Sequence, residues 1–225
     1  MIKSVVVFRR QPGMSVEDFA HYWEHRHGPI VAHLPGLRRY VQSQTLASAY
    51  ARLTPACDGV AELWFDDTQA LRALAGTPEY AAVLADEANF IDPASRIEIL
   101  TEDIVIKDGP RPPQGVKSIE LVKKRPDLTP EAFHRHWEIV HGPLGASIPQ
   151  VLRYVQSHTR LGAYRDGRQP PLDGLALTWF VDTQAMRASA TTPQYATTRA
   201  DEHNFVTEPL DFVIAREREI ALPGR

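Results

Sequence analysis

Cysteine is almost absent from this 225-residue chain, in which Cys57 is the only one. One thiol cannot form an internal disulfide, and it also excludes an iron–sulfur cluster or a metal centre built from several cysteines. Positive charge is not in excess either: 25 lysine and arginine residues stand against 28 acidic residues, and aromatic residues make up only 8% of the chain. We therefore expect no nucleic-acid partner.

Long apolar runs are missing as well. The apolar stretch at the N-terminus ends at Arg9 and Arg10, which makes it too short for a signal peptide or a membrane span. The chain also has no glycine-rich phosphate loop, no dinucleotide fingerprint and no Gly-x-Ser-x-Gly elbow. We therefore expect a cytoplasmic protein with no membrane partner, no bound nucleotide and no α/β-hydrolase mechanism.

What the chain does contain is a repeat of its own first half. A shift of 114 residues, which rises to 115 after a one-residue insertion, superposes the two halves. The matching segments are Trp23-Glu24 with Trp137-Glu138, His27-Gly28-Pro29 with His141-Gly142-Pro143, Tyr40-Val41-Gln42-Ser43 with Tyr154-Val155-Gln156-Ser157, Trp64-Phe65 with Trp179-Phe180, and Asn89-Phe90 with Asn204-Phe205. The repeat unit is a whole domain, so each copy should bury its own core.

The boundary between the copies is marked by proline and glycine. Residues 107–116 contain three prolines and two glycines, which cannot continue a helix or a central strand. We therefore predict two domains, 1–106 and 117–225, joined by a linker over 107–116. Hydrophobic residues make up 43% of the chain, enough to fill a core in each domain.

Each copy has the pattern strand, helix, strand, strand, helix, strand. Ser15 and Thr129 are placed to cap the first helix of each copy, and Phe19 and Trp23 lie four residues apart on its buried face. We expect His27 at the C-terminal end of this helix, where Gly28-Pro29 stops or kinks it. The second helix should be broken near Pro78 and, in the other copy, near Pro193.

This order of elements predicts an α+β fold. A βαββαβ chain forms an antiparallel sheet with both helices on one face, the ferredoxin-like arrangement. The other face of each sheet must be buried. Two copies on one chain can bury these faces against each other, which would give an intramolecular dimeric α/β-barrel. A further pairing of two chains into a homodimer through the helical faces stays open.

His27 and its counterpart His141 are the strongest candidates for catalysis. His27 follows Trp23 by four residues and Phe19 by eight, so it falls on the inward face of the helix. The end of a helix favours the imidazolium, whereas burial beside aromatic rings favours the neutral ring. A histidine under these opposing influences suits general acid–base chemistry. The alternative is a structural role, in which it caps carbonyls or supports the Gly-Pro bend.

Tyr40 and Tyr154 lie on the strand that follows the bend. If their side chains point toward the helices, their hydroxyls could donate to an oxyanion that develops beside the histidine. The alternative is a core tyrosine that bonds to the backbone. His158 lies four residues after Tyr154 on the same strand face, so it could enlarge a polar site in the second copy.

The tryptophans are candidates for binding a planar substrate. Trp23 and Trp137 lie on the first helix of their copies, and Trp64 and Trp179 on the third strand, where they could also form only the cavity wall. The repeated acids Asp86-Glu87 and Asp201-Glu202 read as solvated or paired with arginine. His21 and His25 have a spacing that can chelate a metal, but the second copy lacks both, which favours a solvated helix face and no metal site.

These motifs resemble one known family. The pattern Phe19, Trp23, His27-Gly28-Pro29, Pro35-Gly36-Leu37 and Tyr40, with its echo in the second copy, resembles the EthD family of dimeric α/β-barrel proteins. The second copy departs from the pattern at Gln150, where the first has Gly36. The resemblance implies the fold, whereas relatives of this fold include lactone isomerases, polyketide cyclases, dehydratases, monooxygenases and haem enzymes. In related lactone isomerases this histidine is the catalytic base.

Three hypotheses about function follow. The first is a lyase or isomerase without cofactor, of the dehydratase, decarboxylase, cyclase or C–C lyase type. His27 or His141, with Tyr40 or Tyr154, would act on a small aromatic, polyketide-like or lactone substrate. The second is a non-catalytic protein that binds a small ligand in a catabolic or biosynthetic pathway. The third is a haem enzyme, which would show a Soret band.

Overall fold

The computed structural model describes residues 1–51 and 54–224, and these residues form two compact units. Unit 1 comprises residues 1–100 together with 217–225, and unit 2 comprises residues 101–216. Each copy of the repeat therefore supplies one unit with most of its residues and the other unit with the end of its last strand.

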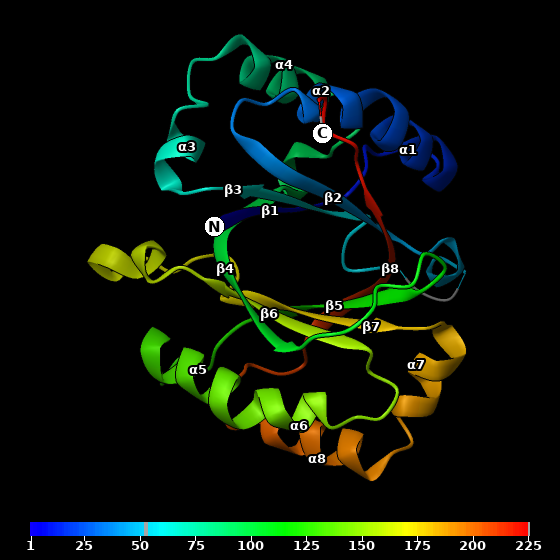
Figure 1. Cartoon of the computed structure of the whole chain (residues 1–225), viewed down its shortest axis with the longest axis vertical. Coiled ribbons are helices and arrows are strands. Elements are labelled where there is room, and N and C mark those ends of the chain that lie inside the picture. The colour runs from blue at the N-terminus through cyan, green and yellow to red at the C-terminus, as the bar shows by residue number, and fades with distance from the viewer. Residues whose placement is uncertain (52–53, 225) are drawn as a thin grey trace. The chain divides into compact units, whose positions relative to one another are not determined.

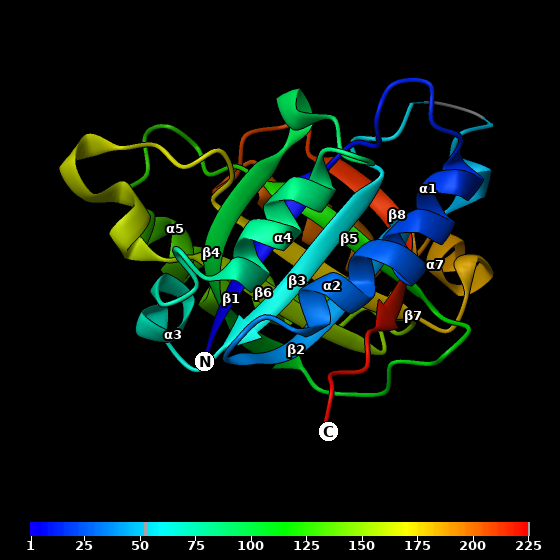
Figure 2. The ribbon, with the colours of Figure 1, turned by 90° about the horizontal axis from the view of Figure 1, so that it is seen from above.

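Unit 1 is built on an antiparallel sheet in which β3 lies between β1 and β2. Figures 1 and 2 show α1, α2 and α4 on one face of these three strands. The elements are β1 (Ile2–Phe8), α1 (Val16–Tyr22), η1 (Trp23–His27), α2 (Gly28–Ala32), β2 (Leu37–Thr45), η2 (Ala47–Ala49), β3 (Gly59–Phe65), α3 (Thr68–Arg72), α4 (Pro78–Glu87), η3 (Pro93–Ser95) and β4 (Ile97–Lys107).

Unit 2 repeats this plan, with β7 between β5 and β6. Helices α5, α6 and α8 lie on one face of its sheet (Figure 1). The elements are β5 (Val116–Val122), α5 (Pro130–His136), η4 (Trp137–His141), α6 (Gly142–Ala146), β6 (Arg153–Thr159), η5 (Leu161–Gly167), β7 (Gly174–Phe180), α7 (Thr183–Ser189), α8 (Pro193–Glu202) and β8 (Asp211–Glu219).

Two strands, β4 and β8, pass from one unit into the other. In unit 2, residues 101–107 of β4 pair with β6, and residues 211–215 of β8 pair with β5. In unit 1, the N–H of Ile220 donates to the carbonyl of Tyr40, at 2.9 Å. The hydrogen-bonded strand order is β1-β3-β2-β8-β5-β7-β6-β4 and is closed. The expected α+β fold class of two ferredoxin-like copies with a closed antiparallel barrel is confirmed.

The first helix of each copy is longer than expected. Gly28-Pro29 does not end it: a π-helical turn, η1, carries the chain from α1 into α2, and the N–H of Gly28 donates to the carbonyl of Trp23. That carbonyl also accepts a hydrogen bond from Gln42 Nε2, at 2.9 Å, which ties the π-helical turn to β2. His27 consequently lies inside the helix rather than at its C-terminal end.

The other predicted helix signals are confirmed. The hydroxyl of Ser15 accepts from the N–H of Asp18, at 2.9 Å, and that of Thr129 accepts from the N–H of Ala132, at 3.2 Å. The second helix is broken as expected before Pro78. The chain forms α3, capped by Asp67, and then α4, which begins at Pro78 after the cap residue Thr77.

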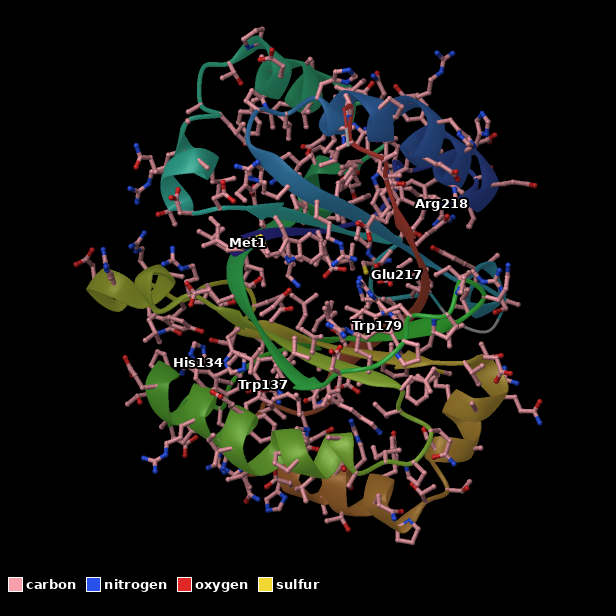
Figure 3. All side chains as sticks on the ribbon, in the orientation of Figure 1. Met1, His134, Trp137, Trp179, Glu217 and Arg218 are labelled. Atoms are coloured by element: carbon pink, nitrogen blue, oxygen red, sulfur yellow. The ribbon has the colours of Figure 1, made fainter. Side chains whose placement is uncertain are left out.

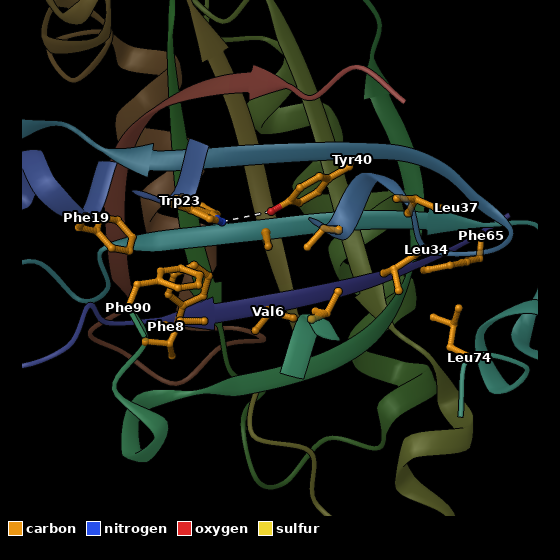
Figure 4. Packing of buried hydrophobic residues seen from close by; sticks show 14 of the residues in the cluster. Val6, Phe8, Phe19, Trp23, Leu34, Leu37, Tyr40, Phe65, Leu74 and Phe90 are labelled. Carbon is orange, nitrogen blue, oxygen red and sulfur yellow. Dashed lines mark hydrogen bonds between the residues drawn. The ribbon is translucent and has the colours of Figure 1, made fainter. Parts of the chain in front are cut away.

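The core of unit 1 is aromatic where the sheet meets the first helix. Phe8 of β1 packs edge-on against Trp23, with ring centroids 5.0 Å apart, and also contacts Phe19 and Phe90 (Figure 4). All four rings are fully buried. This cluster fixes η1 against the sheet, and with it the position of His27.

Candidate active site

Each unit contains a cavity between its sheet and its helices. The cavity of unit 1, called cavity 1 here, has a volume of about 450 Å³ and is lined by His27, Tyr40 and Trp23 among others. Cavity 2, in unit 2, has a volume of about 470 Å³ and is lined by His141 and Tyr154. Both volumes fall in the range of roughly 300–1,000 Å³ that is typical of small-molecule sites.

His27 is held by a carboxylate. Its Nδ1 lies 2.8 Å from Oδ2 of Asp86, at the end of α4, and the imidazole is only 4% exposed. A carboxylate can only accept, so Nδ1 carries the proton and donates it to Asp86. The other ring nitrogen, Nε2, is left as an acceptor and has no hydrogen-bond partner among the described residues.

Burial and the carboxylate act on His27 in opposite directions. Burial lowers the pKa of its imidazole, and the hydrogen bond and charge of Asp86 oppose that shift. Burial also acts to raise the pKa of Asp86, but hydrogen bonds from Tyr22, His27 and Asn89 outweigh it and lower that pKa. At neutral pH the pair is therefore an ionised carboxylate with a neutral imidazole, the state that accepts a proton.

The second copy repeats this pair. His141 Nδ1 lies 3.1 Å from Oδ2 of Asp201, and burial lowers the pKa of this imidazole too, against the effect of Asp201. His136 takes the place of Tyr22 and bonds to Asp201 through Nε2, at 3.0 Å. Asn204 donates to the same carboxylate, at 2.9 Å, as Asn89 does to Asp86. Both asparagines thus orient an acid, a role that sequence analysis did not assign to them.

Tyr40 is positioned as a hydrogen-bond donor. Its hydroxyl oxygen accepts from Trp23 Nε1, at 3.1 Å, and from Gln42 Nε2, at 3.0 Å; Figure 4 marks the contact with Trp23. The hydroxyl proton has no acceptor among the residues that the structure describes, and the side chain lines cavity 1. Burial raises the pKa of Tyr40, so the phenol stays protonated and able to donate. In unit 2, Gln156 Nε2 donates to Tyr154 in the same way, at 3.0 Å.

Charged residues complete both cavities. Cavity 1 is lined by Glu87, Glu98, Arg72 and Arg96, and cavity 2 by Glu120, Glu202, Arg187 and Arg199. Within the described residues there is no group of three or more histidine, cysteine or acidic side chains arranged to hold a metal ion. His21 and His25 are both exposed, as a solvated helix face requires.

The model of the EthD domain matches residues 11–94 and, a second time, residues 125–209. The chain belongs to the EthD family. No curated protein sequence matches this EthD chain.

Solved structures share the fold of this EthD protein at low sequence identity. They include an anthrone oxidase-like protein (12% identity, 98% of this chain and 93% of that chain covered, TM-score 0.66). Others are a candidate monooxygenase from Lactobacillus acidophilus NCFM (13%, 98% and 96%, 0.58) and a mutant chlorite dismutase from Candidatus Nitrospira defluvii (7%, 95% and 90%, 0.51). At these identities the likeness concerns the fold.

The EthD structure brings together some of the predicted site residues and separates others. Trp64 and Trp179 do not line either cavity. Their strand neighbours Leu63 and Phe65 do face cavity 1, so strand alternation turns Trp64 to the opposite face of the sheet, where Arg39 lies 4.6 Å above its ring. Trp179 has the same relation to Thr178 and Phe180.

His158 and Trp137 also lie outside cavity 2. The two rings stack on each other, with centroids 4.4 Å apart, and His134 meets His158 at 4.6 Å; His134 and Trp137 are labelled in Figure 3. His158 Nε2 bonds to Oε1 of Gln156, and burial lowers the pKa of His158 to about 3. This histidine is therefore neutral at physiological pH and packs behind the cavity.

Sequence analysis undervalued the repeated acids. Asp86 and Asp201 bond the two histidines, which the sequence did not suggest. Glu87 and Glu202 are paired with arginine, as expected, and they also line the cavities. Their repetition next to Asn89 and Asn204 was the available signal. This signal was weak because acid and histidine are 59 and 60 residues apart in the two copies, and they meet only through the packing of α4 on η1 and of α8 on η4.

Proposed function

We propose that this EthD protein is a lyase or isomerase that needs no cofactor and that acts on a small aromatic, polyketide-like or lactone substrate. The observation that supports this most directly is the pairing in each cavity of an aspartate-held imidazole with a buried tyrosine. The imidazole offers a free acceptor nitrogen, and in cavity 1 the acceptor positions of the tyrosine are occupied while its proton is not.

The proposed chemistry begins with removal of a proton next to a carbonyl or a phenol. His27 Nε2 takes the proton, and the electron pair of the broken bond moves onto the substrate oxygen. Tyr40 donates a hydrogen bond to the oxyanion that forms, and Asp86 stabilises the imidazolium across Nδ1. Return of the proton at another carbon gives an isomer, whereas loss of a leaving group gives an elimination product.

The apolar lining suits such substrates. Apart from its few charged groups, cavity 1 is bounded by aliphatic and aromatic side chains such as Val6, Leu34 and Phe65. An apolar wall binds a planar ring and strengthens the electrostatic effect of Tyr40 and Asp86 on the reacting atoms, because it excludes water.

The test is replacement of His27 and His141 by alanine, singly and together, with turnover of hydroxyaryl ketones and of unsaturated lactones as readout. We expect turnover to be lost in at least one single variant and in the double variant. His33→Ala is the matched control, because His33 is exposed and, among the described residues, its side chain bonds only to the carbonyl of Pro29. Full activity of the double variant would refute the proposal.

Two other outcomes would point elsewhere. Saturable binding of the same compounds without turnover would support a ligand-binding role in a catabolic or biosynthetic pathway. A Soret band in protein expressed with haem available would support a haem enzyme, with His27 or His141 as the candidate ligand through Nε2.

A further inference from the structure

The two cavities differ in how their carboxylates are paired. In cavity 1, one arginine joins both acids: Arg96 donates to Glu87 and to Glu98, in each case at 2.9 Å. The second oxygen of Glu98 accepts from the hydroxyl of Ser4, at 2.9 Å. Both carboxylates of cavity 1 are therefore hydrogen-bonded to the same arginine.

Cavity 2 leaves part of its carboxyl groups without a partner. Oε1 of Glu202 accepts from Arg199, at 2.7 Å, but its Oε2 is buried and has no hydrogen-bond partner. Glu202 is only 2% exposed and lines the cavity. Glu120, on β5, lines the same cavity and accepts no hydrogen bond from the described residues; the first copy has Val6 at the matching position.

Only Glu202 of this pair is hydrogen-bonded to an arginine, so keeping both carboxyl groups ionised in the cavity costs free energy. Burial and then the charge of Glu120 raise the pKa of Glu202 to about 8, against the opposing charge of Arg199. Burial also raises the pKa of Glu120. The other titratable groups that face this pair are His141 on η4, Tyr154 on β6, Arg187 on α7, Tyr195 on α8 and Glu208 before β8.

We propose that Glu120 and Glu202 share one proton at neutral pH, and that this carboxyl pair is a catalytic acid of cavity 2 that works together with His141. The proposal rests on the proposed function. It assigns to cavity 2 a substrate with a hydroxyl group β to a carbonyl. Cavity 1, whose two acids are both held in hydrogen bonds by Arg96, is assigned substrates that need no leaving-group acid.

The step balances as an elimination. His141 Nε2 takes the proton on the α carbon, and the electron pair of that C–H bond becomes the double bond. The bond from the β carbon to oxygen breaks, and the departing oxygen takes the proton of the carboxyl pair and leaves as water. The enzyme then holds an imidazolium and a second carboxylate, and transfer of the proton from His141 to the pair restores the starting state.

The first test needs no substrate. The whole chain, labelled with ¹³C at the glutamate carboxyl carbons, is titrated by NMR. We expect one glutamate to titrate near pH 8, to disappear in Glu202→Gln, and to move down by at least about one pH unit in Glu120→Val. The valine is tolerated at the matching position of the first copy, and the exposed Glu131→Gln serves as the control. A wild-type chain in which no glutamate titrates above pH 6 overturns the proposal.

The second test separates this proposal from the proposed function. β-Hydroxy ketones are compared with matching ketones that carry a p-nitrophenoxide in the β position, a group that leaves without a proton. Glu202→Gln should slow loss of water by a factor of about 10²–10⁴ and leave loss of nitrophenoxide almost unchanged, whereas His141→Ala should slow both. Equal slowing by Glu202→Gln overturns the acid role alone. No effect of His141→Ala overturns the assignment of catalysis to cavity 2, and only full activity of the variant that lacks both His27 and His141 overturns the proposed function.

Discussion

At the scale of single residues, the carboxylate of Asp86 determines which nitrogen of His27 is free to act as a base. We predict that Asp86→Asn lowers the pKa of His27 further, because burial then acts without the opposing hydrogen bond and charge. The asparagine can also present its amide nitrogen and stabilise the wrong tautomer, so turnover should fall by a factor of about 10²–10⁴. Histidine ring NMR measures the pKa, and Asp66→Asn on the surface is the control. An unchanged pKa of His27 would contradict the assigned pair.

The hydroxyl oxygen of Tyr40 contributes to stability as well as to the site. In Tyr40→Phe, the buried donors Trp23 Nε1 and Gln42 Nε2 both lose the oxygen that accepts from them. We expect the free energy of unfolding to fall by about 1–3 kcal/mol, the cost of a buried polar group left without a partner. Urea denaturation provides the measurement. Tyr80→Phe is the matched control, because Tyr80 lines the same cavity and has no hydrogen bond from its hydroxyl among the described residues.

At the scale of helices and strands, the sequence predicted most of what local rules control. Caps at Ser15 and Thr129, the break before Pro78 and the repeated order of elements all follow from chemistry within a few residues. The π-helical turn did not follow, and its Trp23 carbonyl accepts from Gln42 of β2, a contact that local rules do not reveal. The same limit applies to the site: Tyr40 was identified, whereas the partner of His27 was not.

The close approach of β3 to the first helix leads to a test of this packing. A Cβ on Gly59 would lie 2.7 Å from the ring of Trp23 and 2.9 Å from that of Phe8, both fully buried. We expect Gly59→Ala to lower the free energy of unfolding by about 1–3 kcal/mol, because neither ring has room to move. Gly162→Ala is the control, since a Cβ there meets nothing within 4 Å. Equal urea midpoints for the two variants would show that the rings of Trp23 and Phe8 can move to make room for the added methyl group.

At the scale of the whole chain, buried titratable groups should make stability depend on pH. The pKa of Glu202 is about 8 in the folded state and 4.5 when unperturbed, so between these values the folded state binds more protons than the unfolded state. The contribution of Glu202 to the free energy of unfolding is therefore complete below pH 4.5 and is lost as the pH rises to about 8.

We predict that, as the pH rises through this interval, the unfolding free energy of the wild type falls relative to that of Glu202→Gln. The buried histidines contribute equally to both chains, so they cancel from the difference. Urea denaturation at several pH values between 5 and 9 measures it. A difference that does not vary with pH would mean that Glu202 is ionised in the folded state.

The two copies of the repeat exchange strand ends, so neither copy contains a complete unit. Unit 2 takes residues 101–107 from the first copy, and they pair with β6; unit 1 takes residues 217–225 from the second copy, where Ile220 and Leu222 pack on its core. A copy expressed alone keeps its helices and three of its strands but leaves the edge of β2 or β6 without this partner, and unpaired edges promote association.

We therefore predict that residues 1–106 and 117–225, expressed separately, are each less stable than the full chain and associate with themselves. An equimolar mixture should recover a species of the mass of the full chain, with a higher urea midpoint than either part, because each part then regains the strand it lacked. Size-exclusion chromatography with light scattering and urea denaturation provide the two readouts. A chain ending at Arg216 gives a finer comparison, since it removes only the segment that unit 1 receives. Separate parts that are monomeric and as stable as the full chain would show that the exchanged strands contribute nothing to folding.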